Sequence, residues 1–161
     1  LDKYDRQRIK YPSSGNWLRF GYLKGFMDGT LGSGTAMMYE PFNDEPDKIG
    51  EVIKQICNKD QPDLLLASGG TGPGPRDVTP EVLAKICEKM LDGLGDYLRA
   101  ESQHFTDTAW LSRMTAGMIG QTLIVALPGS PKAVQECWEI IRPFIGDALE
   151  KIAKQGFSQK G

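Results

Sequence analysis

A glycine-rich loop between a buried-strand signature and a helix start is the feature that most restricts how this chain can fold. Four apolar residues at positions 64–67 are followed by residues 69–80, which contain four glycines and the acid Asp77. Glycine lets the backbone approach a ligand closely, and the N–H groups of a new helix N-terminus favour an anion. With the Asp77 carboxylate beside them as a cation ligand, these residues predict a phosphate and metal site at a strand end.

A second stretch of the sequence repeats this arrangement. Residues 122–127 are apolar almost throughout, which predicts a strand covered on both faces. The strand runs into Pro128-Gly129-Ser130-Pro131, a glycine turn with a serine N-cap and a proline in the first helical turn. Because ligands of parallel sheets bind at the carboxyl ends of the strands, we expect both glycine turns to face one ligand.

Two helices are predicted around the first glycine loop. Apolar residues with helical spacing follow Pro46 and continue to Cys57. A further helix is expected to begin at a Thr79 N-cap, to carry an apolar stripe as far as position 90, and to end at Gly93 and Gly95. Each predicted helix therefore stands next to a predicted strand.

The last helix is expected to begin at Pro131 and to continue toward Lys154, with Pro143 inside it and Gly156 as its stop signal. Residues 35–39 predict one more short strand. Strands that alternate with helices of these lengths indicate an α/β fold, in three αβα layers with a mainly parallel sheet. A single domain over residues 1–161 is expected.

Composition excludes several classes of protein. The chain has 161 residues, of which 40% are hydrophobic, and a formal net charge of −2, so no basic field predicts nucleic-acid binding. We find no apolar stretch long enough for a membrane span and no leader pattern, which predicts a cytoplasmic protein without a membrane partner. The three cysteines, Cys57, Cys87 and Cys137, are predicted to be buried reduced thiols.

The loop matches neither generic phosphate motif, since it lacks the Gly-Lys-Ser/Thr ending of a P-loop and the Gly-x-Gly-x-x-Gly spacing of dinucleotide folds. Three segments instead closely resemble, in the same order, the Mog and MoaB family of molybdenum-cofactor biosynthesis proteins. The same motifs form the G domains of larger plant and animal fusion proteins. The three segments are residues 68–81, Leu111-Ser112-Arg113 and residues 127–133, and the resemblance covers residues 35 to 152, approximately.

The resemblance implies the molybdenum cofactor biosynthesis fold and a molybdopterin adenylyltransferase. Such an enzyme transfers AMP from Mg-ATP to the terminal phosphate of molybdopterin and releases pyrophosphate. The essential acidic pair of the family falls on Asp44 and Asp77, with Asn43 in place of the usual proline before the first acid. Two carboxylates that hold Mg²⁺ would neutralise the charge of the reacting phosphates and help to align them.

The remaining site residues fall into two groups. A nucleotide-binding group in the two glycine turns comprises Gly69, Gly70, Thr71, Gly72, Pro128 and Gly129. A molybdopterin-binding group, chosen for its hydroxyl and cationic donors, comprises Ser112, Arg113, Ser130 and Lys132. The resemblance also implies a homotrimer and a hand-over of the product to a molybdate-inserting protein.

Several of these residues also have a purely structural explanation. Asp44 and Asp77 could each cap the helix after it, and Asp77 could instead pair with Arg76. Ser130 is an N-cap whether or not it touches a ligand. Arg113 and Lys132 could be ordinary surface charges. The only histidine, His104, is predicted to be packed or on the surface, without a role in chemistry. The side chains of Trp110, Met114 and Met118 are predicted to serve packing and not to form a binding site.

The amino-terminal part of the chain matches the family least. Residues 1–6 lack the apolar strand that opens the family fold. Asp5-Arg6 and Ser14-Gly15 nevertheless resemble the turn and the helix start that come after that strand in the family, so residues 1–30 are divergent or truncated. An alternative function is therefore a non-catalytic carrier or scaffold that binds molybdopterin. A molybdate-inserting relative and a nucleotide hydrolase on the same fold are further alternatives.

Overall fold

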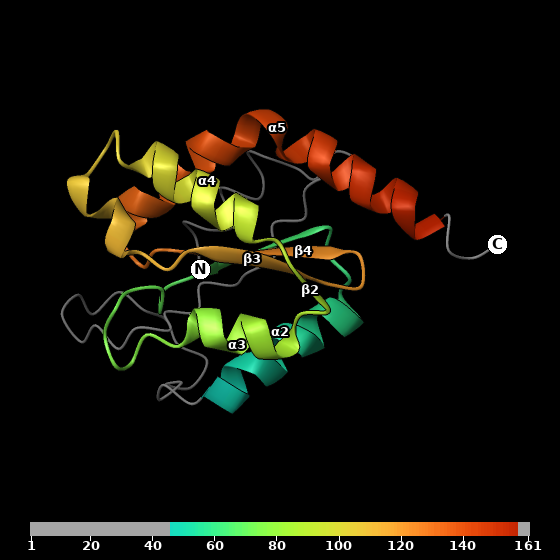
Figure 1. Cartoon of the computed structure of the whole chain (residues 1–161). Helices are drawn as coiled ribbons and strands as arrows, with labels where there is room; N and C mark the ends of the chain where they lie inside the picture. Colours follow the sequence, from blue (N-terminus) through green and yellow to red (C-terminus); the bar gives the residue numbers. More distant parts are fainter. Residues whose placement is uncertain (1–45, 158–161) are drawn as a thin grey trace, which may run out of the picture.

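The structure is a computed structural model that describes residues 46–157, with side chains described as far as residue 154. The predicted strand at residues 35–39, the divergent residues 1–30 and Asp44 lie outside these residues. Figure 1 shows the elements in their chain order. They are α2 (Pro46–Lys59), β1 (Leu64–Ser68), α3 (Thr79–Ile86), β2 (Lys89–Met90), α4 (Asp92–Ser102), the 3₁₀ helix η1 (Asp107–Leu111), β3 (Thr115–Ile119), β4 (Thr122–Leu127) and α5 (Pro131–Phe157).

The strands of residues 46–157 form a four-stranded sheet in the order β1-β4-β3-β2, which lies between two layers of helices. Helices α4 and α5 cover one face and helices α2 and α3 the other (Figure 1), which confirms the α/β fold in three layers. β1 pairs in parallel with β4, with Leu64 opposite Leu123 and Ser68 opposite Leu127. β3 is antiparallel to β4 and to β2, so the described part of the sheet is mixed.

Two structural reasons explain the antiparallel strands. Ile119 of β3 lies opposite Thr122 of β4, and the two-residue connection between them can only join antiparallel strands. Gly120 in that connection has φ +56°, a value that hairpin turns need and that glycine adopts without strain. β3 was not predicted from the sequence, because its alanine and glycine give little strand propensity and pairing with β4 decides its conformation.

The predicted end of the helix after the first glycine loop was wrong. α3 ends at Ile86, and Cys87 is already extended with ψ 140°. The backbone N–H groups of Glu88 and Leu91 donate to carbonyls of β3 at 2.8 Å each, so the chain joins the sheet edge as β2 where a longer helix was expected. Gly93 and Gly95 lie inside the next helix, α4, which was not predicted as a separate element.

Gly95 explains why a glycine stands inside α4. A Cβ atom at this position would lie 2.4 Å from the backbone oxygen of Met114, immediately before β3. Only glycine therefore lets the helix approach the sheet so closely. A Cβ atom added at Gly93 would lie within 4 Å of no described atom beyond the nearby backbone of its own helix, so that glycine has no such packing reason.

β4 forms the centre of the hydrophobic core, and all six of its residues are buried. Leu123, Val125 and Leu127 pack in the cluster with α4 and α5, while Ile124 and Ala126 pack in the cluster with α2 and α3. Side chains of a strand alternate between its two faces, so one strand supplies both halves of the core. The expectation that this strand is covered on both faces is confirmed.

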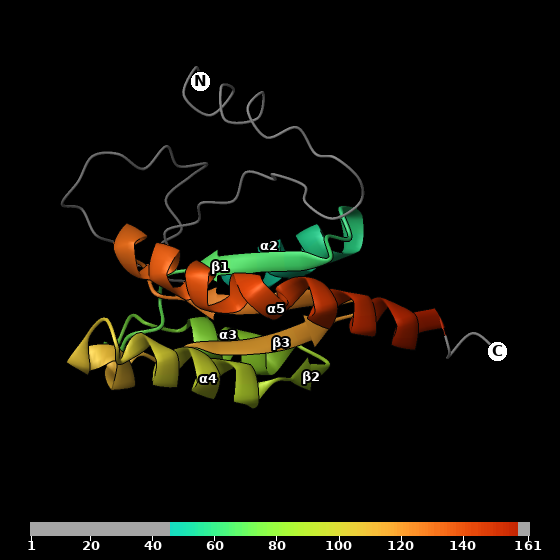
Figure 2. The ribbon, with the colours of Figure 1, turned by 90° about the horizontal axis from the view of Figure 1, so that it is seen from above.

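α5 begins at Pro131 as predicted, and the Ser130 hydroxyl accepts a hydrogen bond from the backbone N–H of Ala133 at 3.1 Å, which confirms the N-cap. The helix continues past Gly156 to Phe157, so the predicted stop was wrong. Its C-terminal turns extend beyond the end of the sheet in both views (Figures 1 and 2). Among the described residues, no helix is both long enough and apolar enough to cross a membrane.

The thiols of Cys57, Cys87 and Cys137 are free, with the first and last buried and Cys87 half-buried. Burial, followed by the neighbouring Cys57 and Glu88, raises the pKa of Cys87 to about 11. Burial also raises the pKa of the other two thiols.

The thiolate is the reactive form, so we expect Cys87 in the native protein to react with iodoacetamide at pH 8 at least about 10²-fold more slowly than in the unfolded chain. Mass spectrometry of labelled peptides measures both rates, and a native rate within threefold of the unfolded rate would contradict this expectation.

Candidate functional site

The two glycine turns lie side by side at the carboxyl ends of β1 and β4. The backbone N–H of Gly69 donates to the carbonyl of Leu127 at 2.9 Å, and the Ser68 hydroxyl donates to the carbonyl of Pro128 at 3.4 Å. The parallel pairing of the two strands places both turns at one edge of the sheet. The expectation that the two turns face the same place is confirmed.

A hollow of about 310 Å³ opens at this edge. Seven of the residues predicted for the site line it: Gly70, Thr71, Gly72, Asp77, Ser112, Pro128 and Gly129. Three further described residues, which were not predicted from the sequence, also line it: Pro73, Thr108 and Leu111. The volume lies at the lower end of the range for small-molecule sites, and most of the lining comes from the two glycine turns and the η1 segment.

The first glycine turn has a conformation that requires glycine. Gly69 and Gly70 are buried and have φ of +106° and +66°. A Cβ atom on Gly70 would lie 2.4 Å from Oγ1 of Thr79. That hydroxyl donates to the carbonyl of Gly69 at 2.8 Å, and the backbone N–H of Thr79 donates to the carbonyl of Gly70 at 3.1 Å.

Thr79 therefore has a different role from the one predicted. The N-cap position of α3 is Val78, and no side chain caps the helix there. Thr79 is fully buried and joins the start of α3 to the start of the loop through its hydroxyl and its backbone N–H. The helix N-terminus is thus held against the glycine turn.

The Asp77 side chain lies within the loop and is hydrogen-bonded to it. Its Oδ2 accepts a hydrogen bond from the backbone N–H of Gly74 at 2.9 Å, and its own N–H donates to the carbonyl of Gly74 at 3.1 Å. Cβ atoms at Gly72 and Gly74 would lie 2.7 and 2.8 Å from Oδ2, so these glycines make room for the carboxylate. Oδ1 of Asp77 accepts no hydrogen bond from the part of the chain that the structure describes.

The structural alternatives for Asp77 are not observed. The carboxylate does not cap α3, whose N-cap is Val78 without a side-chain hydrogen bond. It also forms no ion pair with Arg76 among the described residues. A carboxylate that lines the hollow with one oxygen without a donor is suited to a hard cation such as Mg²⁺.

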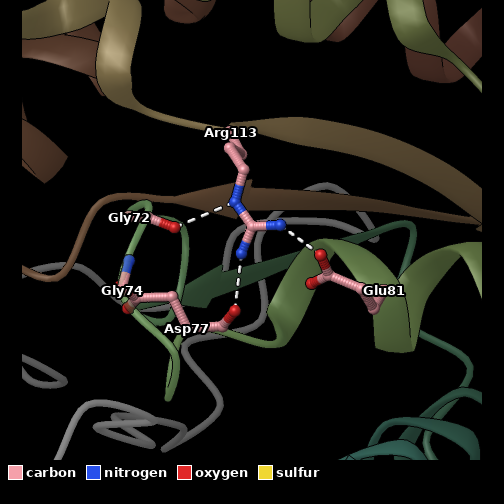
Figure 3. Close-up of polar contacts among 5 residues, drawn as sticks. All are labelled: Gly72, Gly74, Asp77, Glu81 and Arg113. Carbon is pink, nitrogen blue, oxygen red and sulfur yellow. Dashed lines mark hydrogen bonds and ion pairs between the residues drawn. The ribbon is translucent and has the colours of Figure 1, made fainter.

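Arg113 contacts the loop (Figure 3) and does not line the hollow. Its Nε donates to the carbonyl of Gly72 at 2.9 Å, its Nη2 donates to the carbonyl of Asp77, and its Nη1 pairs with the carboxylate of Glu81. The backbone N–H of Arg113 also donates to the carbonyl of Thr71 at 2.6 Å. The side chain that was predicted to hold molybdopterin is therefore engaged with the loop.

Thr71 and Ser112 join the two predicted groups of site residues. Their hydroxyl oxygens lie 3.3 Å apart, and both residues line the hollow. Ser130 and Lys132 do not line the hollow, and Lys132 is exposed and pairs with Glu136 at 3.5 Å. Gly69 shapes the turn without lining the hollow.

The residues near η1 divide into buried and exposed sets. Met114 is 2% exposed and Met118 is partly buried in the same cluster, which confirms their packing role. Trp110 is 58% exposed, so its predicted packing role was wrong. His104 lies on the surface, as one of the two predicted alternatives stated.

No group of three or more potential metal-ligating side chains occurs within residues 46–154. Asp77 is the acidic residue that lines the hollow in that part of the chain. Its predicted partner Asp44 lies outside the described residues, so the structure does not test the acidic pair.

The ion pair of Glu81 with Arg113 predicts a pH dependence of stability. Partial burial raises the pKa of the Glu81 carboxyl, but the hydrogen bonds from Arg113 and from the backbone, with the charge of Arg113, lower it by more. The net pKa is below its ordinary value, so the pair stabilises the fold fully above about pH 4.3 and less as the pH falls through the lowered pKa. We expect the difference in unfolding free energy between wild type and Glu81→Gln to be largest near pH 7 and to shrink below pH 4. Denaturant titrations across this range measure it, and a difference that grows as the pH falls would contradict the assignment.

The fold and the hollow together define an α/β ligand-binding domain, whose site is built from two glycine turns at the carboxyl ends of adjacent parallel strands. A family model described as a probable molybdopterin binding domain matches residues 33–147. The chain belongs to this family, which includes the Mog and MoaB proteins.

Individual relatives agree with this assignment. A Helicobacter pylori protein named molybdopterin adenylyltransferase is 45% identical over 114 residues, which cover 71% of this chain and 65% of that protein. The Drosophila melanogaster molybdenum cofactor synthesis protein cinnamon is 40% identical over 68% of this chain and 18% of its own length. The crystal structure of the molybdopterin biosynthesis enzyme MoaB from Thermus thermophilus superposes with a TM-score of 0.63 at 39% identity, covering 68% of this chain and 69% of that one. The chain thus spans a little less than two thirds of the Helicobacter protein.

Proposed function

We propose that this chain is a molybdopterin adenylyltransferase that transfers AMP from Mg-ATP to the terminal phosphate of molybdopterin. One observation carries the proposal: the glycine loop with Asp77 and the segment with Ser112 line the same hollow. Relatives at 35 to 45% identity carry the name of this activity, which supports the choice of reaction. A site that brings the two substrates together is what a transfer between them requires.

The glycine loop is the side of the hollow suited to the triphosphate. Gly70, Thr71 and Gly72 line the hollow with little or no side chain, so phosphate oxygens can approach the backbone. The start of α3 is held against this turn by Thr79, so its positive dipole end lies close to the loop. Pro128 and Gly129 form the neighbouring wall. We assign these residues, with Gly69 behind them, to the nucleotide.

Asp77 is the proposed ligand of Mg²⁺. Its oxygens are hard donors, and Oδ1 accepts no hydrogen bond among the described residues, so the residue fits this cation. When bound, Mg²⁺ would offset the negative charge of the triphosphate. Asp44 is the proposed second carboxylate.

The other side of the hollow is assigned to molybdopterin. The Ser112 hydroxyl, which lies 3.3 Å from that of Thr71, is a donor for the terminal phosphate next to the nucleotide loop. Ser130 and Lys132 are proposed to contact the part of the ligand that extends outside the hollow. The ion pair of Lys132 with Glu136 is no obstacle, since its two atoms lie 3.5 Å apart and the Lys132 side chain is exposed, so the pair contributes little free energy.

The proposed reaction is a single displacement at phosphorus. An oxygen of the terminal phosphate of molybdopterin forms a bond to the α-phosphorus of ATP. The bond between that phosphorus and the bridging oxygen to the β-phosphate breaks, and its electron pair leaves with pyrophosphate. The contribution of the chain is to hold both substrates in line and to compensate their charge.

The same proposal includes a cytoplasmic enzyme that assembles as a homotrimer and passes its product to a molybdate-inserting protein. The support for these points is the resemblance to the Mog and MoaB family. Sedimentation equilibrium of the purified chain tests the assembly, with a threefold mass expected.

Equilibrium binding distinguishes the transferase from a carrier that only binds molybdopterin. We expect ATP to bind saturably in the presence of Mg²⁺, and its affinity to fall at least about tenfold when EDTA removes the metal. Titration calorimetry with a non-hydrolysable ATP analogue measures both affinities. Tight binding of molybdopterin together with no detectable nucleotide binding would contradict the proposal and favour the carrier.

A further inference from the structure

The Arg113 side chain forms hydrogen bonds with both ends of the loop that carries Asp77. Nε and Nη2 of Arg113 donate to the carbonyls of Gly72 and Asp77, the first and last residues of the turn. Nη1 pairs with Glu81, one turn into α3. Figure 3 shows the guanidinium group between these three acceptors, with Gly72 on one side and Glu81 on the other.

Within the turn, Asp77 binds Gly74 through its carboxylate and its backbone N–H. These bonds fix the shape of the turn but not its direction relative to the rest of the hollow. The contacts of Arg113 supply that direction, because its backbone N–H also binds Thr71 and the residue before it, Ser112, lines the hollow. Arg113 thus holds Asp77 in a fixed position relative to Ser112, on the other side of the hollow.

We propose that Arg113 is a positioning residue, anchored by Glu81, that holds the loop of residues 72–77 so that the Asp77 carboxylate faces the hollow. This inference rests on the proposed function for its kinetic consequence. It replaces the sequence-based expectation that Arg113 holds molybdopterin directly. Arg113 acts through Asp77 and the loop, and Glu81 acts through Arg113.

Lysine is a poor substitute at this position. A planar guanidinium can reach three acceptors in fixed directions, whereas an ammonium group at the end of a flexible stem cannot hold the same three at once. The variant Arg113→Lys therefore retains the positive charge and loses the geometry. A role that depends only on charge would survive this change.

Glu81 gives a test in which the two explanations predict opposite results. If Arg113 held an anionic substrate, Glu81→Gln would remove a competing carboxylate and would improve or preserve binding of molybdopterin. If Glu81 anchors a positioning residue, the same change loosens the loop and lowers turnover. The matched control is Glu139→Gln, which breaks another exposed pair, with Arg142 on α5.

The experiment combines hydrogen exchange with steady-state kinetics on wild type, Arg113→Lys, Glu81→Gln, the double variant and Glu139→Gln. We expect the amides of residues 72–77 to exchange about tenfold faster in Arg113→Lys and a few-fold faster in Glu81→Gln. The kcat should fall about 10- to 100-fold in Arg113→Lys and less in Glu81→Gln, with the KM for molybdopterin within about threefold of wild type. The kcat of the double variant should be no lower than that of Arg113→Lys, because both changes disrupt the same set of contacts between Arg113, Glu81 and the loop.

Two results would overturn the inference. One is unchanged exchange of residues 72–77 in both single variants. The other is a KM for molybdopterin that rises tenfold or more in Arg113→Lys and falls in Glu81→Gln at constant kcat. Exchange requires no turnover, so a wild-type chain that transfers no AMP would refute the proposed function separately. Glu81→Gln changes one surface carboxylate and keeps the test available if Arg113→Lys fails to fold.

Discussion

Asp77→Asn is expected to lower the kcat for AMP transfer about 10²- to 10³-fold. The amide oxygen of asparagine can still accept the hydrogen bond from the Gly74 N–H, so the loop should keep its shape. What the variant loses is the negative charge beside the hollow, which weakens the proposed binding of Mg²⁺. Steady-state rates at several Mg²⁺ concentrations measure the effect, and part of the loss should be recovered at high Mg²⁺.

The control for this variant is Asp147→Asn. Asp147 lies exposed on α5, and Asp147→Asn makes the same change of net charge away from the hollow. It should leave kcat within about twofold of wild type, since exposed substitutions seldom matter. A kcat of Asp77→Asn within threefold of wild type would remove Asp77 from the catalytic machinery.

Gly70→Ala is expected to have the largest effect on stability among the changes considered. The left-handed φ of +66° disfavours any residue with a Cβ, and that Cβ would lie 2.4 Å from Oγ1 of Thr79. Relief of this contact breaks the buried hydrogen bond from Thr79 to Gly69. Together these terms amount to about 2–4 kcal/mol, or a decrease in melting temperature of about 5–15 °C.

Gly146→Ala provides the matched control for that change. Gly146 lies inside α5, and apart from the nearby backbone of that helix no atom of the described residues lies within 4 Å of the Cβ that alanine would add. Alanine has the better helix propensity, so this variant should be more stable than wild type by up to about 1 kcal/mol. Thermal unfolding of the two variants compares them directly, and a melting temperature of Gly70→Ala equal to that of wild type would refute the strain argument.

The fold could be predicted from the sequence where one pattern was strong. The run at residues 122–127 is apolar apart from Thr122, and the structure buries all six residues as β4. The helix start at Pro46 and the strand at residue 64 follow equally plain signals. In these segments, local propensity and tertiary packing favour the same structure.

The prediction failed where packing overruled the pattern. The apolar stripe from Val82 to Met90 continues the spacing of α3, but the chain leaves the helix after Ile86 because β3 offers backbone partners for Glu88 and Leu91. A glycine pair at positions 93 and 95 resembles a helix stop, and yet Gly95 is needed for close contact with the chain before β3. Neither the pairing with β3 nor the close approach to the backbone of Met114 can be identified from local sequence.

Some residues of the candidate site could likewise be predicted from the sequence, and others could not. The glycine turns and Asp77 were found because glycine, proline and an acid near a helix start form a visible motif. The role of Arg113 was not visible, because its acceptors lie at least 32 residues earlier and are mostly backbone carbonyls. Thr108 and Leu111 were missed since η1 is short and has no regular apolar spacing.

The most direct test of the transferase assignment is transfer of label from α-labelled ATP to molybdopterin by the purified chain with Mg²⁺. The proposed mechanism predicts labelled adenylyl-molybdopterin with one pyrophosphate released for each AMP transferred, and transfer that collapses in Asp77→Asn. Molybdopterin that binds to the wild-type chain without acquiring label at any Mg²⁺ concentration would contradict the transferase assignment.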